Sequence, residues 1–446
     1  NPFEQPKDFY KRGKSTGNSQ KYQCKECKKI TNVLPSKKES TTYHQKRNDI
    51  LPRFAKLLLS KMPVKRTCEY LGIGSKTYYT KLEWLYRCCL EFLDKYETRG
   101  FQNLSFNQMW INTDKMQYNL NNIRKKGKGG KYESTSEDKL LQTHIVISAD
   151  VKSRYVFRSD VAYDWDISLS EIMNDTLWYR EDHIDTFCRK NDRLRYSYYP
   201  MEPTKEDDQD FASYASDLLK VKERERFIDG LHVKSTYNTI AHYWMIQQMV
   251  QAKEWRFITD EDQSIMSAMY RVFSNDFRLY NAHHFICKLD KSKSRKQAYE
   301  EHKEANQFLR DWGAVKASRS YSLYGLAQQY LEEELRHHEF CKEIVLPEKR
   351  AMVWLNNPIQ HPLASIDKGY MTVDCRTDVS IFDPPELASM LLTVNEHATN
   401  SFIQQIRRRI SVLERPLVTA RGDGKSYIYA NFNPKYAQYA ITILRT

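Results

Sequence analysis

The sequence lacks the segments that would carry a protein into or across a membrane. No run of roughly eighteen consecutive apolar residues occurs in it, and no signal-peptide pattern opens it. Its nine cysteines are odd in number and widely spread, unlike the dense, even set of a small secreted domain held by disulfides. We therefore expect a cytoplasmic protein in a reducing compartment, without a membrane partner.

An initiator methionine is also missing, since the chain begins at Asn1. We expect the sequence to be truncated there, and also after Thr446, which closely follows a strand-like run at 439–444. The 446 residues and 53.1 kDa are enough for several domains and a sizeable core.

Basic residues exceed acidic ones, with 70 Lys and Arg against 57 Asp and Glu, so the net charge is +13. Phosphate neutralisation dominates the affinity of proteins for nucleic acids. A basic but otherwise ordinary soluble protein would show the same total. The clustering of the basic residues favours a nucleic-acid partner.

The pair Cys24 and Cys27 lies in a polar, basic segment that we assign to residues 1–45. A CxxC followed by basic residues is typical of the second knuckle of a zinc ribbon, whose closed site needs four ligands. No cysteine precedes Cys24, and His44 lies on the wrong side of the knuckle. We expect a partial zinc ribbon, which would bind Zn²⁺ only if an upstream cysteine pair exists in the full-length protein. The alternative is that this CxxC is incidental.

Residues 46–100 are predicted to form a helix-turn-helix domain. Apolar residues recur at helical spacing over 47–61, and the stretch 64–79 is typical of a short helix, a glycine-containing turn and a second helix capped by Ser75. Residues early in a recognition helix contact bases and phosphates. An ordinary helical hairpin is the alternative. The candidate DNA-contacting residues are Lys76, Thr77, Tyr78 and Lys81.

Two β-like runs far apart in the chain each stop at a carboxylate. One covers 109–114 and ends at Asp114, and the other covers 255–260 and ends at Asp260. Between them we predict a hairpin of strands at 140–149 and 154–163, an insertion at about 164–235, and a helix at 236–253. This is the order of an RNase H-like core, in which the first and fourth strands are adjacent and parallel.

Such a pair of carboxylates can hold metal ions. Two or three carboxylates on neighbouring elements bind two Mg²⁺ ions about 4 Å apart, which promote in-line phosphoryl displacement. A single strand-terminal Asp is more often a cap or a turn residue. Two of them at the expected places in the expected topology favour an Mg²⁺ (or Mn²⁺) site.

A basic, glycine-bearing segment follows the first acid and could track a phosphate backbone or form a solvated loop. Its candidate DNA-contacting residues are Arg124, Lys125, Lys126 and Lys128.

The chain resembles bacterial insertion-sequence transposases of the DDE superfamily, which have an RNase H-like core. The resemblance rests on the CxxC with the helical domain, on the runs ending at Asp114 and Asp260, and on an arginine-rich late helix. It implies an α/β catalytic domain over 101–446, with a mixed sheet flanked by helices. It also implies a nucleoid-associated protein that works as a homo-oligomer on double-stranded DNA, both the terminal inverted repeats and the target.

The third acid departs from the family pattern. The resemblance implies a Glu about two turns before the arginines of a helix that we predict at about 386–413, and that position holds Asn400. Glu396 lies one turn earlier on the same face. Glu396 is our first choice as a metal ligand, and the alternatives are Asn400 as a neutral ligand or a catalytically dead protein.

Several other polar residues lie near these motifs in the sequence. His283 and His284 could approach a scissile phosphate or be packed, Asp262 could replace Asp260, and Asp160 and Asp164 are assigned to the surface or to support of the site. The arginines assigned to DNA phosphates are Arg407, Arg408, Arg409 and Arg415.

The leading hypothesis is therefore a DNA transposase that binds element ends and catalyses Mg²⁺-dependent strand cleavage and strand transfer. A catalytically inactive, transposase-derived repressor and an RNase H-fold nuclease without strand transfer are the alternatives.

Overall fold

The computed structural model describes residue 2 and residues 5–14, 20–32, 47–120, 141–166, 210–216, 231–290, 292–316, 321–346, 349–414, 417–418, 425–426 and 433–446. Within these ranges, no helix is both long and apolar enough to cross a membrane.

A small antiparallel sheet lies at the N-terminus, separate from the main sheet. It consists of β1 (Phe9–Lys14), β2 (Gln20–Cys24) and β3 (Ile30–Asn32), in that order. Cys24 is the last residue of β2, so the CxxC occupies the turn into β3. A sheet this small has little side-chain material with which to build a core of its own.

A helical unit follows, formed by α1 (Leu51–Leu58), α2 (Val64–Leu71) and α3 (Ser75–Leu93). Gly72 ends α2 in the left-handed conformation, at φ 61°, which glycine adopts without strain. The next helix is capped by Gly74 rather than by Ser75, which is the first residue of α3. The predicted Ser75 cap is therefore wrong. A π-helical turn (Asp94–Thr98) and α4 (Arg99–Gln102) complete this unit.

The core of the molecule is a seven-stranded sheet with the order β13-β14-β10-β9-β4-β5-β6. β4 (Ser105–Leu120) pairs in parallel with β9 (Gln251–Thr259), which pairs in parallel with β10 (Ala282–Leu289). β5 (Leu141–Asp150) and β6 (Val156–Val161) continue the sheet in antiparallel fashion. This mixed sheet fits an RNase H-like core, and the predicted parallel contact between the first and fourth of its strands is confirmed.

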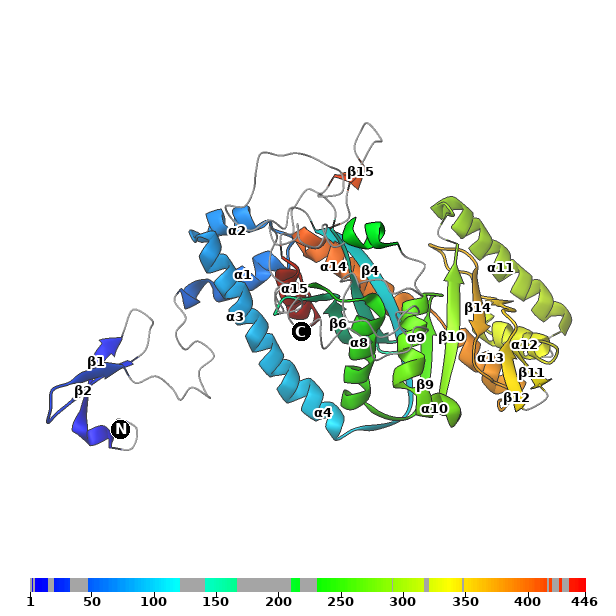
Figure 1. Ribbon diagram of the computed structural model, residues 1–446, viewed down its shortest axis with the longest axis horizontal. Coiled ribbons are helices and arrows are strands. Elements are labelled where there is room, and N and C mark those ends of the chain that lie inside the picture. The colour runs from blue at the N-terminus through cyan, green and yellow to red at the C-terminus, as the bar shows by residue number, and fades with distance from the viewer. Residues whose placement is uncertain are drawn as a thin grey trace.

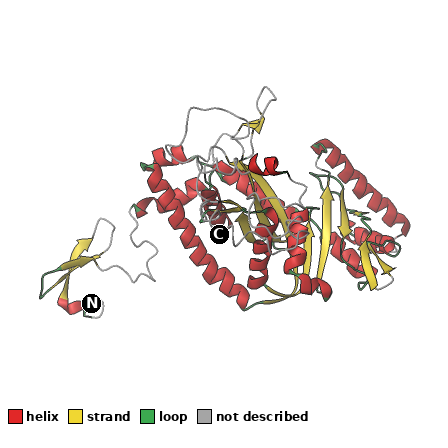
Figure 2. Ribbon diagram, viewed as in Figure 1, coloured by secondary structure: helices red, strands yellow, loops and turns green. Residues whose placement is uncertain are grey.

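Helices cover both faces of this sheet (Figures 1 and 2). α8 (Ser235–Met249) and α9 (Gln263–Val272) pack on Met109, Ile111 and Phe257, and α10 (Ser274–Arg278) follows α9. α14 (His397–Arg409) and α15 (Pro434–Arg445) pack on the other face, around Met116 and Ile147. Because side chains alternate along a strand, odd-numbered residues of β4 face α8 and α9, and even-numbered ones face α14.

The predicted insertion begins and ends at a pair of short strands. β7 (Tyr163–Asp164) pairs antiparallel with β8 (Leu231–His232), so the two ends of the intervening segment meet at one point. Between them, only residues 210–216 belong to the described part of the chain, and 211–216 are helical.

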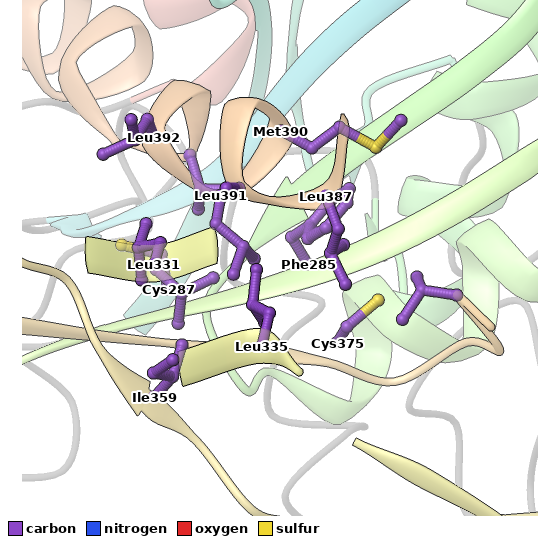
Figure 3. Close-up of a cluster of buried hydrophobic side chains, with 14 of the residues drawn as sticks. Phe285, Cys287, Leu331, Leu335, Ile359, Cys375, Leu387, Met390, Leu391 and Leu392 are labelled. Carbon is purple, nitrogen blue, oxygen red and sulfur yellow. The ribbon is translucent and has the colours of Figure 1, made fainter. Parts of the chain in front are cut away.

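A second long segment, between β10 and α13 (Pro384–Thr393), extends the sheet beyond β10. Leucines of its helices and of α13 pack over Phe285 and Cys287 of β10 (Figure 3). This packing makes the segment part of the same hydrophobic core. The elements of the segment are α11 (Arg295–Lys316), α12 (Leu323–Leu335), β11 (Cys341–Leu346), β12 (Lys349–Trp354), β13 (Ile359–Gln360) and β14 (Met371–Cys375).

The late helix predicted at 386–413 is broken in two. α13 ends at Thr393, and α14 begins at His397 with Glu396 as its N-cap residue. The predicted C-terminal strand at 439–444 is also wrong, because these residues belong to α15. Its Tyr439 and Ile443 complete the core of α1–α3, so the end of the chain joins the helical unit to the sheet. The pair β15 (Leu417–Val418) and β16 (Lys425–Ser426) lies between α14 and α15 in sequence.

Candidate active site

Asp114 and Asp260 occupy neighbouring positions on two parallel strands. The last residue pair between β4 and β9 is Thr113 with Thr259, and each aspartate is the next residue. β9 stops there, as predicted, but β4 continues past Asp114 to Leu120. The prediction that the first strand ends at its acid is thus wrong. Asp114 reaches the edge of the parallel pair because its neighbouring strand ends.

Asp114 shares the face of the sheet that α14 covers with the other even-numbered residues of β4. The buried Asn112, two residues before Asp114, accepts a hydrogen bond from the Thr399 backbone N–H (3.2 Å) and one from the Thr399 hydroxyl. The Asn112 side-chain amide donates to the Ile258 carbonyl (3.3 Å). One asparagine therefore ties β4, β9 and the first turn of α14 together.

Glu396 stands at the start of α14, where this contact brings the helix onto the sheet. Its side chain is 10% exposed, and its Oε2 accepts a hydrogen bond from the Asn400 side-chain amide (3.2 Å). The Lys368 ammonium lies 4.0 Å from the same oxygen. Glu396 and Asn400 thus meet on one face as predicted, and the carboxylate is the anionic member of the pair.

The charges of Glu396 and Asp260 both influence the buried thiol of Cys287. Burial raises the pKa of Cys287, and the carboxylates of Glu396 and Asp260 raise it further, while Lys368 lowers it. Cys287 lies on β10, whose parallel partner is β9. Two carboxylates from distant parts of the chain therefore influence the same thiol of β10.

These carboxylates fit a magnesium site in their chemistry, because hard Mg²⁺ prefers oxygen ligands and keeps several waters. Among the described residues, no three His, Cys, Asp or Glu side chains are grouped closely enough to hold a metal by themselves. Asp114 and Asp260 each follow the last residue pair of two parallel strands, and α14, whose N-cap residue is Glu396, docks on β4 through Asn112.

Asp262 has a different task from Asp260. Its Oδ1 accepts hydrogen bonds from the backbone N–H groups of Ser264 and Ile265, so it caps α9, and it lies 2.8 Å from the Lys115 ammonium. Burial alone would raise the pKa of Asp262, but Lys115 and the hydrogen bonds outweigh it and lower the pKa to about 2. Asp262 is therefore committed to capping α9 and to its ion pair with Lys115.

Asp160 belongs to a buried network on the opposite face. Its carboxylate contacts Arg158 (2.8 Å) and His242 Nδ1 (2.6 Å), and His242 Nε2 contacts the Ser148 hydroxyl (2.8 Å). Ser148 in turn hydrogen-bonds Thr113 (2.6 Å), next to Asp114. His242 and Ser148 are buried. These contacts therefore stabilise β4 on the face that carries Thr113, and they provide no nucleophile that a substrate could reach.

His283 and His284 are packed rather than poised over a substrate. His284 is fully buried between the Thr259 hydroxyl (2.9 Å) and the Tyr270 hydroxyl (2.7 Å), and burial lowers its pKa to about 3. Burial likewise lowers the pKa of His283 to about 4. Of the two readings that the sequence left open, the geometry favours packing.

The helical unit presents only part of the predicted DNA-contacting set. Lys76 is exposed and Thr77 half-buried at the start of α3. Tyr78 and Lys81 are 3% and 2% exposed and lie inside the unit. Their assignment to DNA contact is corrected, because side chains on the inner face of α3 pack against α1 rather than face a groove.

Other predicted residues are distributed as follows. Arg408 and Arg409 are exposed in the last turn of α14, and Arg407 is half-buried there. Arg124, Lys125, Lys126, Lys128, Arg415 and His44 lie outside the described residues. Asp164 is half-buried in β7.

The Cys24 and Cys27 pair lies close together in its turn. Hydrogen bonds from the backbone of Cys27 and Glu26, and then from the Cys27 thiol, lower the pKa of Cys24. A lowered thiol pKa favours the thiolate that binds metals. The two sulfurs supply half of the four ligands that a closed zinc site needs.

The sequence alone did not identify three residues that shape this site. Asn112 and Lys115 flank the motif of Asp114, and their alternation along β4 could have indicated that they support it from its two faces. No sequence pattern indicates a role for Lys368, because only the fold brings it beside Glu396.

Comparisons with known proteins are sparse. No family model matches the chain, and no curated protein matches it. Among solved structures, a pre-cleavage Mos1 transpososome is 11% identical, with 69% of this chain and 75% of that chain covered and a TM-score of 0.11. A Mos1 mariner paired-end complex with Mn is also 11% identical, with the same coverage and a TM-score of 0.13. Scores this low do not establish a common fold, so the topology above rests on its own strand order.

Proposed function

We propose that the protein is a DDE-type DNA transposase, which binds the ends of its element and catalyses Mg²⁺-dependent strand cleavage and strand transfer. The proposal is supported by the neighbouring positions of Asp114 and Asp260, at the point where β9 ends in an RNase H-ordered sheet, and by α14, which has Glu396 at its start and docks on β4. Two of these acids come from adjacent strands and the third from a helix docked on them through Asn112.

Asp114, Asp260 and Glu396 would hold Mg²⁺ or Mn²⁺. When bound, such ions activate a water or a 3′-hydroxyl and stabilise the leaving oxygen of an in-line phosphoryl displacement. The chain's own contribution is placement. Asn112 fixes the start of α14, and Asn400 orients the Glu396 carboxylate through its amide.

DNA binding would involve surfaces on both sides of this site. Lys76 and Thr77 would contact DNA from the helix-turn-helix, and Arg408 and Arg409 would contact phosphates from α14. The basic segment with Arg124 and its neighbours belongs to the same proposal. A Zn²⁺ ion at Cys24 and Cys27 is part of it only with two further ligands. Because strand transfer joins two ends to a target, a homo-oligomer in the cytoplasm, at the nucleoid, is the proposed working form.

Of the alternatives, an inactive repressor is disfavoured by one observation. The Glu396 carboxylate accepts a hydrogen bond from the Asn400 amide, so an acid is available beside Asn400 as the third ligand. A nuclease that cuts without joining is separated from a transposase only by experiment.

The test uses the full chain and a plasmid that carries its gene with the flanking DNA. With Mg²⁺ or Mn²⁺, we expect nicks at the element ends and joining of a pre-cut 3′-hydroxyl end to target DNA. Asp114→Asn and Asp260→Asn should abolish both, whereas Asp311→Asn, a matched change on the exposed side of α11, should abolish neither. DNA binding with no cutting by the unaltered chain would overturn the proposal in favour of a repressor, and cutting without joining would favour a nuclease.

A further inference from the structure

A tight turn of the segment inserted after β10 lies beside the candidate active site. Ser365 and Gly369 exchange two backbone hydrogen bonds of 2.8 Å each, which close the turn that carries Ile366, Asp367 and Lys368. Gly369 has φ +71°, a conformation that L side chains rarely adopt. The turn is therefore held in one shape by its own backbone.

Two residues of α11 hold this turn in place. Glu301 accepts a hydrogen bond from the Tyr370 backbone N–H (2.8 Å) and pairs with Lys293 (2.8 Å). His302, the next residue of α11, hydrogen-bonds the Ala364 carbonyl (2.7 Å). A Cβ on Gly369 would come within 2.0 Å of Glu301 Oε2. Contacts on both sides of the turn thus fix its direction relative to the sheet.

The anchored turn directs Lys368 to the third acid. Its ammonium lies 4.0 Å from Glu396 Oε2, and its side chain is 39% exposed. A separation of 4.0 Å is longer than a hydrogen bond, so the ammonium lies near the carboxylate without donating a hydrogen bond to it. Lys368 also acts on Cys287, the same thiol that Asp260 and Glu396 influence.

We propose that Lys368 is a substrate-positioning residue, whose ammonium binds a phosphate of the DNA strand engaged at Asp114, Asp260 and Glu396. This inference rests on the proposed function. An exposed lysine–carboxylate pair contributes only about 0–1 kcal/mol to folding. Folding stability alone therefore does not explain why an anchored turn holds Lys368 beside Glu396. Each phosphate neutralised by a lysine releases counterions and strengthens DNA binding in a salt-dependent way.

The test compares Lys368→Gln with Lys368→Arg and with a matched control, Lys316→Gln. Lys316 also forms an ion pair with a glutamate, Glu333 (2.7 Å), and its side chain is 52% exposed. It lies on α11 roughly 22 Å along the helix from Glu301. The control thus removes the same charge and the same kind of ion pair away from the site.

The first measurement is the affinity for a duplex that contains the element end, titrated with salt in the presence of EDTA. We expect Lys368→Gln to reduce the slope of log affinity against log salt by about one. Lys368→Arg should keep the slope of the unaltered chain, and so should Lys316→Gln. The second measurement is cleavage with Mn²⁺, in which Lys368→Gln should raise KM for DNA by roughly tenfold and change kcat less.

An unchanged slope and KM in Lys368→Gln, with an unaltered chain that cuts DNA, would overturn this inference and leave the proposed function standing. An equal loss of slope in Lys316→Gln would overturn it as well, because the effect would then be one of net charge. If the unaltered chain neither binds nor cuts the DNA, the proposed function fails and this inference fails with it.

Discussion

The side-chain oxygen of Asn112 accepts two hydrogen bonds from Thr399, a residue 287 positions later in the chain. Its amide group donates to the carbonyl of Ile258 on the neighbouring strand. Both Asn112 and Thr399 are buried. The placement of Glu396 relative to Asp114 and Asp260 therefore depends on one amide group that cannot exchange these partners for water.

Replacing Asn112 by alanine should destabilise the fold and disorganise the candidate site. The variant leaves the Thr399 N–H and hydroxyl and the Ile258 carbonyl without their partner, and a buried unsatisfied group costs about 1–3 kcal/mol. We expect urea unfolding to show a loss of about 2–4 kcal/mol. Asn395→Ala removes hydrogen bonds to the Thr393 carbonyl (2.9 Å) and from the His397 backbone N–H (3.0 Å) at a half-buried position, and it should lose clearly less. Equal losses in the two variants would contradict the linking role of Asn112.

Glu396 and Asn400 should differ sharply in their effect on cleavage. Glu396→Gln removes a metal-binding charge and should reduce the cleavage rate on the order of a thousandfold or more, because such charge stabilisation is worth several kcal/mol. Asn400→Ala removes only the hydrogen bond that orients this carboxylate and should reduce the rate roughly tenfold to a hundredfold. Single-turnover cleavage in Mn²⁺ measures both. A larger loss in Asn400→Ala than in Glu396→Gln would identify Asn400 as the ligand instead.

Lys76 and Lys81 should separate DNA binding from folding within one helix. Lys76→Gln alters an exposed side chain, and the salt dependence of DNA affinity should fall by about one phosphate contact. Lys81→Met replaces a buried lysine whose pKa is lowered by burial, so the DNA affinity and its salt slope should not change. Fluorescence anisotropy at several salt concentrations checks both variants. A reduced slope in Lys81→Met alone would mean that the outer face of α3 had been misassigned.

Buried neutral histidines should make the fold sensitive to mild acid. Burial lowers the pKa to about 4 for His144, His283 and His361 and to about 3 for His284. These histidines bind protons near pH 6.5 in the unfolded chain but not in the folded chain. The free energy of unfolding is therefore not reduced by them above about pH 6.5, and it falls as the pH drops toward about 4. Each such group removes up to about 1.4 kcal/mol per pH unit.

Urea unfolding of His284→Gln at about pH 7.5 and about pH 5.5 checks this prediction. The decrease in the free energy of unfolding between the two pH values should be about 1 kcal/mol smaller in the variant than in the unaltered chain. His337→Gln, at an exposed position, should keep the full dependence. A histidine variant that loses stability equally at both pH values, with the original dependence intact, would show that His284 does not contribute to it.

Local patterns in the sequence were sufficient for a good part of the core. The hairpin of β5 and β6, the helix α8 and the strand that stops before Asp260 follow from periodicity and turn residues. The parallel contact of β4 with β9 followed from the handedness of a crossover through a helix. Chain ends and breaks were predicted less well. A single late helix was expected where Thr393 and His397 bound a break, and a strand was expected where α15 packs against α3.

Residue types and their order are evident from the amino-acid sequence: two acids after β-branched and aromatic runs, a glutamate with an asparagine one turn later, and a basic surplus. The tertiary structure decided which of them meet. Asp114 lies in the middle of a strand and is accessible only because β9 ends beside it. Glu396 starts a helix because the chain breaks there, and Lys368 approaches it from a turn held by α11. These contacts join residues far apart in the chain, and local propensity carries no information about which distant backbone a side chain will face.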